Sequence, residues 1–227
     1  MRHVFVESNW VFGCCAPTHR QLPEALSLIE EARNGNISLH VPSICLREGA
    51  EAIRQKCQPR ADDVRNFVRS ALERGLLSAA QTDETRRFLQ LYTSTISREL
   101  EDVQAKADSL RELPGIDVFG LTDDVAQRVF DVRHVPDLKP FDEIILAAIL
   151  VRNNELREAG VATDTSFCEL DGDLRPWDKQ GRRREPLCTI YDDARIWVYG
   201  DFGLRNPPPP AGWPNVRWAN DKWTPIA

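Results

Sequence analysis

The sequence has no long hydrophobic run and no paired cysteine motif. No stretch approaches the ~20 apolar residues of a membrane-spanning helix, so we expect no membrane span. The first residues also lack the basic-then-apolar pattern of a secretory signal peptide. The six cysteines form no C-x-x-C pair and the four histidines are scattered, so a zinc site is not expected. Reduced thiols in a cytoplasmic protein are the simplest interpretation.

An excess of basic residues is absent as well. The chain has 35 acidic and 29 basic residues, a net charge of -6. This balance argues against a protein whose whole surface binds nucleic acid, but it is compatible with a local basic rim around an acidic pocket. The 227 residues, 42% of them hydrophobic, can form one large domain or one domain with an insertion.

The first predicted strand, residues 3–10, ends in polar residues. Three apolar residues in succession are followed by Glu7, Ser8 and Asn9. A continuous apolar run is typical of a central strand that is covered on both faces. Polar residues at the carboxyl end of such a strand lie where open α/β sheets usually bind ligands, so Glu7 is a candidate functional residue.

Predicted strands and helices alternate along the rest of the chain, which favours a parallel sheet with helices on both faces. We therefore predict a three-layer α/β/α sandwich over residues 1–203, with a helical hairpin inserted at about 60–113. A tail rich in proline and tryptophan, residues 204–227, is expected to pack on the domain, with residues 207–210 as a polyproline II spacer. The further strands are predicted at 37–41, 116–120, 161–170 and 195–199, and the helices at 22–33, 42–57, 60–77, 82–113, 122–133 and from 138 onward.

Two predicted helices carry an acid near their buried side. Glu48 shares a stripe with Ile44, Cys45 and Ala52, and a buried acid needs a partner or a metal. Asp142 lies in the first turn of the helix that is apolar almost all round. A salt bridge would explain Glu48 equally well, and compensation of the helix dipole would explain Asp142.

Charged residues also gather after the strand predicted at 161–170. Asp171 and Asp173 flank a glycine, either as a plain turn or as ligands at the carboxyl end of the strand. Arg182, Arg183 and Arg184 follow in a polar loop that is either solvated or in contact with phosphate.

Four motifs in this order resemble the PIN-domain nucleases. They are acid-x-Asn at the end of the first strand, an inward Glu after a V-P-S helix start, Asp-x-x-x-x-Ala opening a buried helix, and D-x-D after a late strand. The resemblance covers roughly residues 1–58 and 115–203. That family usually begins with aspartate, where this chain has Glu7.

The resemblance implies an endoribonuclease that cleaves single-stranded RNA and depends on Mg²⁺ or Mn²⁺. Crowded carboxylates repel one another unless a hard cation binds them, which agrees with this function. The implied metal ligands are Glu7, Glu48, Asp142 and Asp171, with Asp173 as a fifth candidate. Ser8 and Asn9 would orient Glu7 or contact the substrate, and the candidates for a basic rim are Lys139, Arg175, Arg182, Arg183 and Arg184. The resemblance also implies a possible homodimer and a possible antitoxin or other protein partner.

Two other functions are compatible with the same pattern. One is a binding module that keeps the fold without catalysis, because Glu7 replaces the usual aspartate. The other is an α/β phosphohydrolase with a covalent aspartyl nucleophile, although such an enzyme would place Asp-x-Asp after the first strand, where this chain has Glu7-Ser8-Asn9.

Overall fold

The computed structural model describes residues 1–58, 61–162, 165–170, 172–178, 182–204, 216–219 and 222–225; for 61–65 and the last two segments it describes the backbone alone. A five-stranded parallel sheet forms the centre, in the order β3-β2-β1-β4-β5. The strands are β1 (Arg2–Val6), β2 (Ile37–Pro42), β3 (Ile116–Phe119), β4 (Thr165–Cys168) and β5 (Ile196–Tyr199). The predicted α/β class with a parallel sheet is confirmed.

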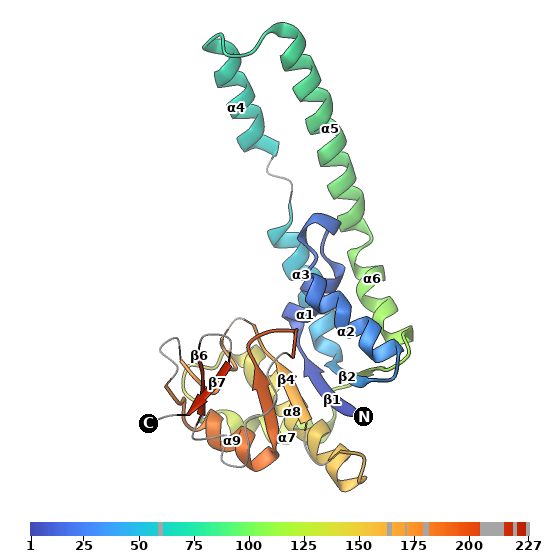
Figure 1. Cartoon of the computed structure of the whole chain (residues 1–227), viewed down its shortest axis with the longest axis vertical. Coiled ribbons are helices and arrows are strands. Elements are labelled where there is room, and N and C mark those ends of the chain that lie inside the picture. Colours follow the sequence, from blue (N-terminus) through green and yellow to red (C-terminus); the bar gives the residue numbers. More distant parts are fainter. Residues whose placement is uncertain are drawn as a thin grey trace.

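Two groups of helices accompany the sheet, in agreement with a three-layer arrangement (Figure 1). In the first group, α1 packs on α2 and α3, and α3 packs on α6; in the second, α8 contacts α7 and α9. The helices are α1 (Ser8–Cys15), α2 (Pro23–Arg33), α3 (Ser43–Lys56), α6 (Val103–Ser109), α7 (Asp123–Val132), α8 (Pro140–Glu158) and α9 (Leu187–Ala194), with short 3-10 turns at η1 (Thr18–Arg20) and η2 (Leu110–Glu112).

The core lies along β1 and α8. Val4, Phe5 and Val6 of β1 are fully buried, as a strand between two neighbours and two helical layers requires. The middle of α8, Ile145 to Leu150, is buried in succession, which confirms that this helix is central. Burial of each such aliphatic side chain contributes about 1.5–3 kcal/mol to the hydrophobic free energy of folding.

The inserted hairpin consists of α4 (Ala61–Glu73) and α5 (Ala79–Glu101), and it extends away from the body that contains the sheet (Figure 1). Ser78 caps α5 through a capping box with Gln81. The helix predicted at 82–113 was too long, because α5 ends at Glu101 and α6 begins at Val103. One apolar periodicity runs through both helices, so the pattern did not reveal the break between them.

Two element boundaries near the site differ from the sequence predictions, and one helix was not predicted. The strand predicted at 3–10 ends at Val6, and residues from Ser8 onward form α1, because a short apolar run fits a strand or a buried helix equally well. Pro42 ends β2 rather than opening the following helix, which begins at Ser43. The short helix α9 was not predicted.

The chain closes with an antiparallel pair, β6 (Val216–Ala219) and β7 (Lys222–Pro225), in which Trp218 lies opposite Trp223. The predicted polyproline segment and Trp213 lie outside the described residues. Packing of the tail on the domain stays a prediction. Within the described ranges, no helix has the length and apolarity needed to cross a membrane.

Candidate functional site

The carboxyl ends of β1 and β4 define the candidate site. In the strand order 3-2-1-4-5, the chain changes direction across the sheet between β1 and β4, and such switch points open a crevice outside the carboxyl ends of the strands. Val6 pairs with Cys168 in the sheet, so Glu7 and Glu169 each follow the last paired residue of neighbouring strands. Two acidic side chains therefore begin at the same point of this edge.

Glu7 is 5% exposed and occupies the N-cap position of α1. The side-chain amide of Asn9 donates a hydrogen bond of 2.7 Å to Oε1 of Glu7. The prediction that Asn9 orients Glu7 agrees with this contact. The positive end of α1 also lies beside the carboxylate, and such a helix end favours negative charge.

Glu48 reaches this edge because α3 packs closely on α1. An added Cβ on Gly49 would lie 2.7 Å from the Cβ of Val11, so only glycine allows this approach. Ser8 at the start of α1 donates a hydrogen bond from Oγ to Oε2 of Glu48. Glu48 is half-buried, which agrees with the predicted inward stripe.

The buried thiol of Cys45 is affected by the charges of both Glu7 and Glu48. Burial raises the pKa of Cys45 well above its usual value, and the negative charges of Glu7 and Glu48 raise this pKa further, while a hydrogen bond with Ser8 lowers it. Both carboxylates thus act on one buried thiol, and the hydrogen bond from Ser8, the residue after Glu7, to Glu48 links them at the same edge.

Glu169 is the acid that the sequence analysis missed. It is fully buried, and its Oε2 accepts a hydrogen bond of 2.8 Å from Nε of Arg175. Its Oε1 accepts a bond of 2.7 Å from the backbone N–H of Gly172, whose φ of 96° suits glycine. The missed signal was the position directly after β4, which matches the position of Glu7 after β1.

Tyr191 of α9 is a buried residue whose pKa is affected by Glu169 and by two other acids. Burial raises the pKa of Tyr191 well above its ordinary value, and the charge of Glu169 is the next largest cause. The charges of Glu7 and Asp142 also raise this pKa, whereas the charge of Arg184 lowers it. The hydroxyl of Tyr191 donates a hydrogen bond of 3.0 Å to the carbonyl of Leu174. The charges of Glu7, Glu169 and Asp142 thus all act on one buried phenol.

Asp142 lies in the first turn of α8 and is half-buried, as predicted. Asp173 instead forms an exposed ion pair with Lys139. An exposed pair of this kind contributes roughly 0–1 kcal/mol to stability. Asp171, a predicted metal ligand, lies outside the described residues.

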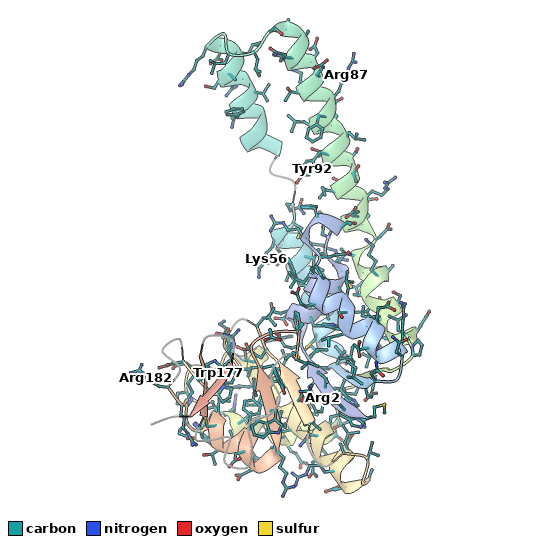
Figure 2. All side chains as sticks on the ribbon, in the orientation of Figure 1. Arg2, Lys56, Arg87, Tyr92, Trp177 and Arg182 are labelled. Atoms are coloured by element: carbon teal, nitrogen blue, oxygen red, sulfur yellow. The ribbon has the colours of Figure 1, made fainter. Side chains whose placement is uncertain are left out.

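The residues of the predicted basic rim, Lys139 and four arginines, have partners inside the protein. Arg184 donates from Nη1 to the carbonyls of Gly172, Asp173 and Arg175, and Arg175 binds Glu169. These two arginines hold the segment that follows β4. Arg182 and Arg183 are exposed and pair with Asp178 and Glu185; Figure 2 shows Arg182 at the periphery of the molecule.

The donor set of the cluster suits a hard cation. Glu7, Glu48, Asp142 and Glu169 offer only carboxylate oxygens, the ligands that Mg²⁺ and Mn²⁺ prefer. Among the residues that the structure describes, no three His, Cys, Asp or Glu side chains already have the arrangement of a metal site. The chemistry of the donors therefore fits the predicted metal. Metal binding would require Glu7, Glu48 or Glu169 to move, because these side chains now accept hydrogen bonds from Asn9, Ser8 and Arg175, respectively.

A separate groove of about 510 Å³ lies among α7, α8 and α9. Its walls include Asp124, Arg128, Arg157 and Asp193, and none of the predicted site residues. The groove mixes acids and bases without the convergence seen at the sheet edge. We therefore place the candidate site at the acidic cluster.

Comparison with known proteins adds no assignment to this geometry. No family model, no curated protein and no solved structure matched the chain.

Proposed function

We propose that the protein is a metal-dependent endoribonuclease that cleaves single-stranded RNA. The observation that supports the proposal is that Glu7 and Glu169 follow the paired ends of β1 and β4, while Glu48 is hydrogen-bonded to Ser8, the residue after Glu7. Asp142 lies in the first turn of α8 and acts with Glu7 and Glu169 on the pKa of Tyr191. Glu48 belongs to α3 and Asp142 to α8. Glu7 directly follows β1, and Glu169 directly follows β4. Helix caps and isolated salt bridges explain one acid at a time. They do not explain why the charges of Glu7 and Glu48 both act on Cys45, or why those of Glu169, Glu7 and Asp142 all act on Tyr191.

The four carboxylates would hold Mg²⁺ or Mn²⁺, directly or through water. A cation held by these residues would supply activation of water for attack on a phosphodiester and neutralisation of the leaving oxygen. Glu169 takes the ligand role at the end of β4 that Asp171 had in the sequence prediction. The side chains of Asn9 and Ser8 hold Glu7 and Glu48 in place.

Exposed basic side chains that precede α8 and α9 would bind the RNA backbone. Lys139 precedes α8 by one residue, and its side chain is 71% exposed. The exposed Arg182 and Arg183 are further candidates for phosphate contacts. Preference for single-stranded RNA rests on the resemblance to PIN-domain nucleases.

Cleavage of a fluorescent single-stranded RNA in the presence of Mn²⁺ tests the proposal. Wild type is expected to cleave, and Asp142→Asn and Glu169→Gln are expected to lose at least 100-fold of the rate, because each loses one negative oxygen ligand. Asp124→Asn is the matched control, since Asp124 also lies in the first turn of a helix but outside the cluster. Equal rates in all three variants would contradict the proposal.

A binding module without catalysis is the second candidate. The contacts of Asn9, Ser8 and Arg175 with the acids favour it, because three of the acids already have hydrogen-bond donors inside the protein. It predicts that wild type binds single-stranded RNA or a protein partner without cleavage in Mn²⁺ or Mg²⁺, and that Asp142→Asn leaves the binding unchanged.

A further inference from the structure

The α4–α5 hairpin has too little core of its own. Among its described side chains, Val68, Ala71 and Thr82 are the buried ones toward its tip, while Ile96 and Leu100 are buried at the foot of α5, the end next to α6. Two helices bury their apolar stripes fully only with further helices beside them. In Figure 1 the hairpin projects beyond the body, so the body does not cover most of its length.

Large apolar side chains are exposed along this hairpin. Phe67 and Leu76 are 71% exposed, Phe88 and Leu91 are 67% exposed, and Leu72 is 40% exposed. With large side chains of roughly 200 Å² each, these fractions correspond to about 600 Å² of apolar surface. This summed area, spread over α4, the turn after it and α5, approaches the ~800 Å² that each partner buries in a standard interface.

The sequence of α5 indicates which partner fits. Glu84, Phe88, Leu91, Thr95 and Arg98 follow one another at spacings of four, three, four and three residues, so they share one face of the helix. Phe88 and Leu91 form the apolar centre of this stripe. Glu84 and Arg98, both exposed, lie seven residues on either side of Leu91. The segment Leu89 to Ser97 between them contains no charged residue.

Such a stripe is complementary to itself in the antiparallel direction. When two copies of α5 pack around a two-fold axis at Leu91, Glu84 of one copy lies opposite Arg98 of the other, twice per dimer. A parallel arrangement would instead place like charges together. We propose that the hairpin is a dimerisation element, which pairs with the hairpin of a second copy of this chain to form a four-helix bundle.

The dimer leaves the acidic cluster of each copy outside the bundle, because the stripe lies on the projecting hairpin and the cluster lies at the sheet edge of the body (Figure 1). Figure 2 shows Arg87 and Tyr92 along this projecting part of α5. The inference is independent of the proposed nuclease activity.

Sedimentation of the full chain at micromolar concentration tests the dimer. Wild type is expected at twice the chain mass of 25.8 kDa. Phe88→Glu is expected at the monomer mass, since a charge replaces the apolar centre. Phe130→Glu is the matched control, because Phe130 is 69% exposed on α7, away from the hairpin, and this variant is expected to stay dimeric. A monomeric wild type, or the same mass for both variants, would overturn the proposal.

Reversal of the charges at Glu84 and Arg98 tests whether the partner of α5 is a second copy of this chain. Glu84→Arg alone and Arg98→Glu alone are each expected to weaken the dimer about tenfold, because two exposed pairs become repulsive. A mixture of the two variants is expected to regain wild-type dimer strength, since each repulsive partner then meets its complement. Circular dichroism checks that both variants keep the helical content of wild type. A mixture that stays as weak as the single variants would show that α5 does not pair antiparallel with itself.

Discussion

At the scale of single residues, Glu169 and Arg175 show what burial demands of the site. Glu169 is fully buried, and a buried carboxylate costs several kcal/mol unless a positive charge and hydrogen bonds compensate it. Arg175 supplies that charge, and the N–H of Gly172 supplies a further bond. Arg175 therefore has a structural role at the site, whether or not it also contacts a substrate.

Replacement of Arg175 by glutamine is expected to destabilise the fold by about 2–3 kcal/mol. The expected loss of stability is smaller than the roughly 3–5 kcal/mol lost when one partner of a fully buried ion pair is removed, because the Arg175 side chain is 25% exposed. Mn²⁺ should stabilise the Arg175→Gln variant more than wild type, because the cation replaces the lost positive charge beside Glu169. Urea denaturation with and without Mn²⁺ measures both effects.

Arg182→Gln is the control for that comparison. Arg182 is 74% exposed in its pair with Asp178, so we expect a loss of roughly 0–1 kcal/mol and no added response to Mn²⁺. If the Arg175→Gln variant is equally unstable with and without Mn²⁺, then Mn²⁺ does not bind beside Arg175 and Glu169.

A buried histidine pair gives the stability a pH dependence. His3 Nδ1 lies 2.9 Å from His40 Nε2, and His40 Nδ1 lies 2.8 Å from Asp117, which also binds Arg152. Burial lowers the pKa of His3 below 6.5, and the charges of His40 and the N-terminus lower it further. The unfolded chain therefore binds more protons as the pH falls below about 6.5, and the folded state loses stability in that range.

His3→Gln is expected to reduce the slope of unfolding free energy against pH between about 7 and 5, since glutamine does not titrate. Asp117 does not affect this window, because its pKa is lowered from 3.8, mainly by its hydrogen bond with His40, and its contribution is lost only at lower pH. His134→Gln, at an exposed position, is the control. An unchanged slope in His3→Gln would show that His3 does not cause the acid sensitivity.

Glu7, Glu48 and Asp142 could be predicted from the sequence, whereas Glu169 could not. For the first three, an apolar strand, an inward stripe and a helix start each mark the acid locally. Glu169 is marked only by where β4 ends. That end is set by pairing with β1 and β5, which lie far away in the sequence, and the strand predicted at 161–170 concealed it.

At the scale of elements, the contact between α1 and α3 decides whether Glu7 and Glu48 share one cluster. The contact is close because α3 has glycine at position 49, beside Val11 and the carbonyl of Ser8. The sequence predicts α3 but extends the first strand to Trp10, into the first residues of α1. The packing of these two helices on each other was therefore not predictable, although both acids were.

Gly49→Ala is expected to destabilise the protein by about 1–3 kcal/mol, the usual cost of overpacking, even though alanine is the better helix former. The added Cβ would lie 2.7 Å from Val11 and 3.1 Å from the carbonyl oxygen of Ser8, so α1 must shift together with the site. Denaturation in urea measures the loss of stability.

Gly120→Ala provides the comparison, since nothing lies within 4 Å of its added Cβ and we expect a change near zero. The same effect on stability at positions 49 and 120 would contradict the close approach of α1 and α3.

At the scale of the whole molecule, two separate surfaces have separate roles in this account. The candidate metal site lies at the carboxyl ends of β1 and β4. The proposed dimer stripe belongs to α5, in the hairpin that projects from the body (Figure 1). The sequence predicted the parallel sheet and the insertion, because alternating apolar segments and long amphipathic stretches are local signals. It did not predict the strand order, which depends on which buried strand pairs with which and fixes the switch point.

Calorimetric titration of Mn²⁺ tests the central claim, that the carboxylates at the β1/β4 edge form one metal site. Wild type and Asp124→Asn are expected to bind Mn²⁺ alike, and Asp142→Asn and Glu169→Gln are expected to bind it at least tenfold more weakly, because each loses an anionic ligand. The result that would contradict the account is no Mn²⁺ binding to wild type, or binding of equal strength in all four proteins.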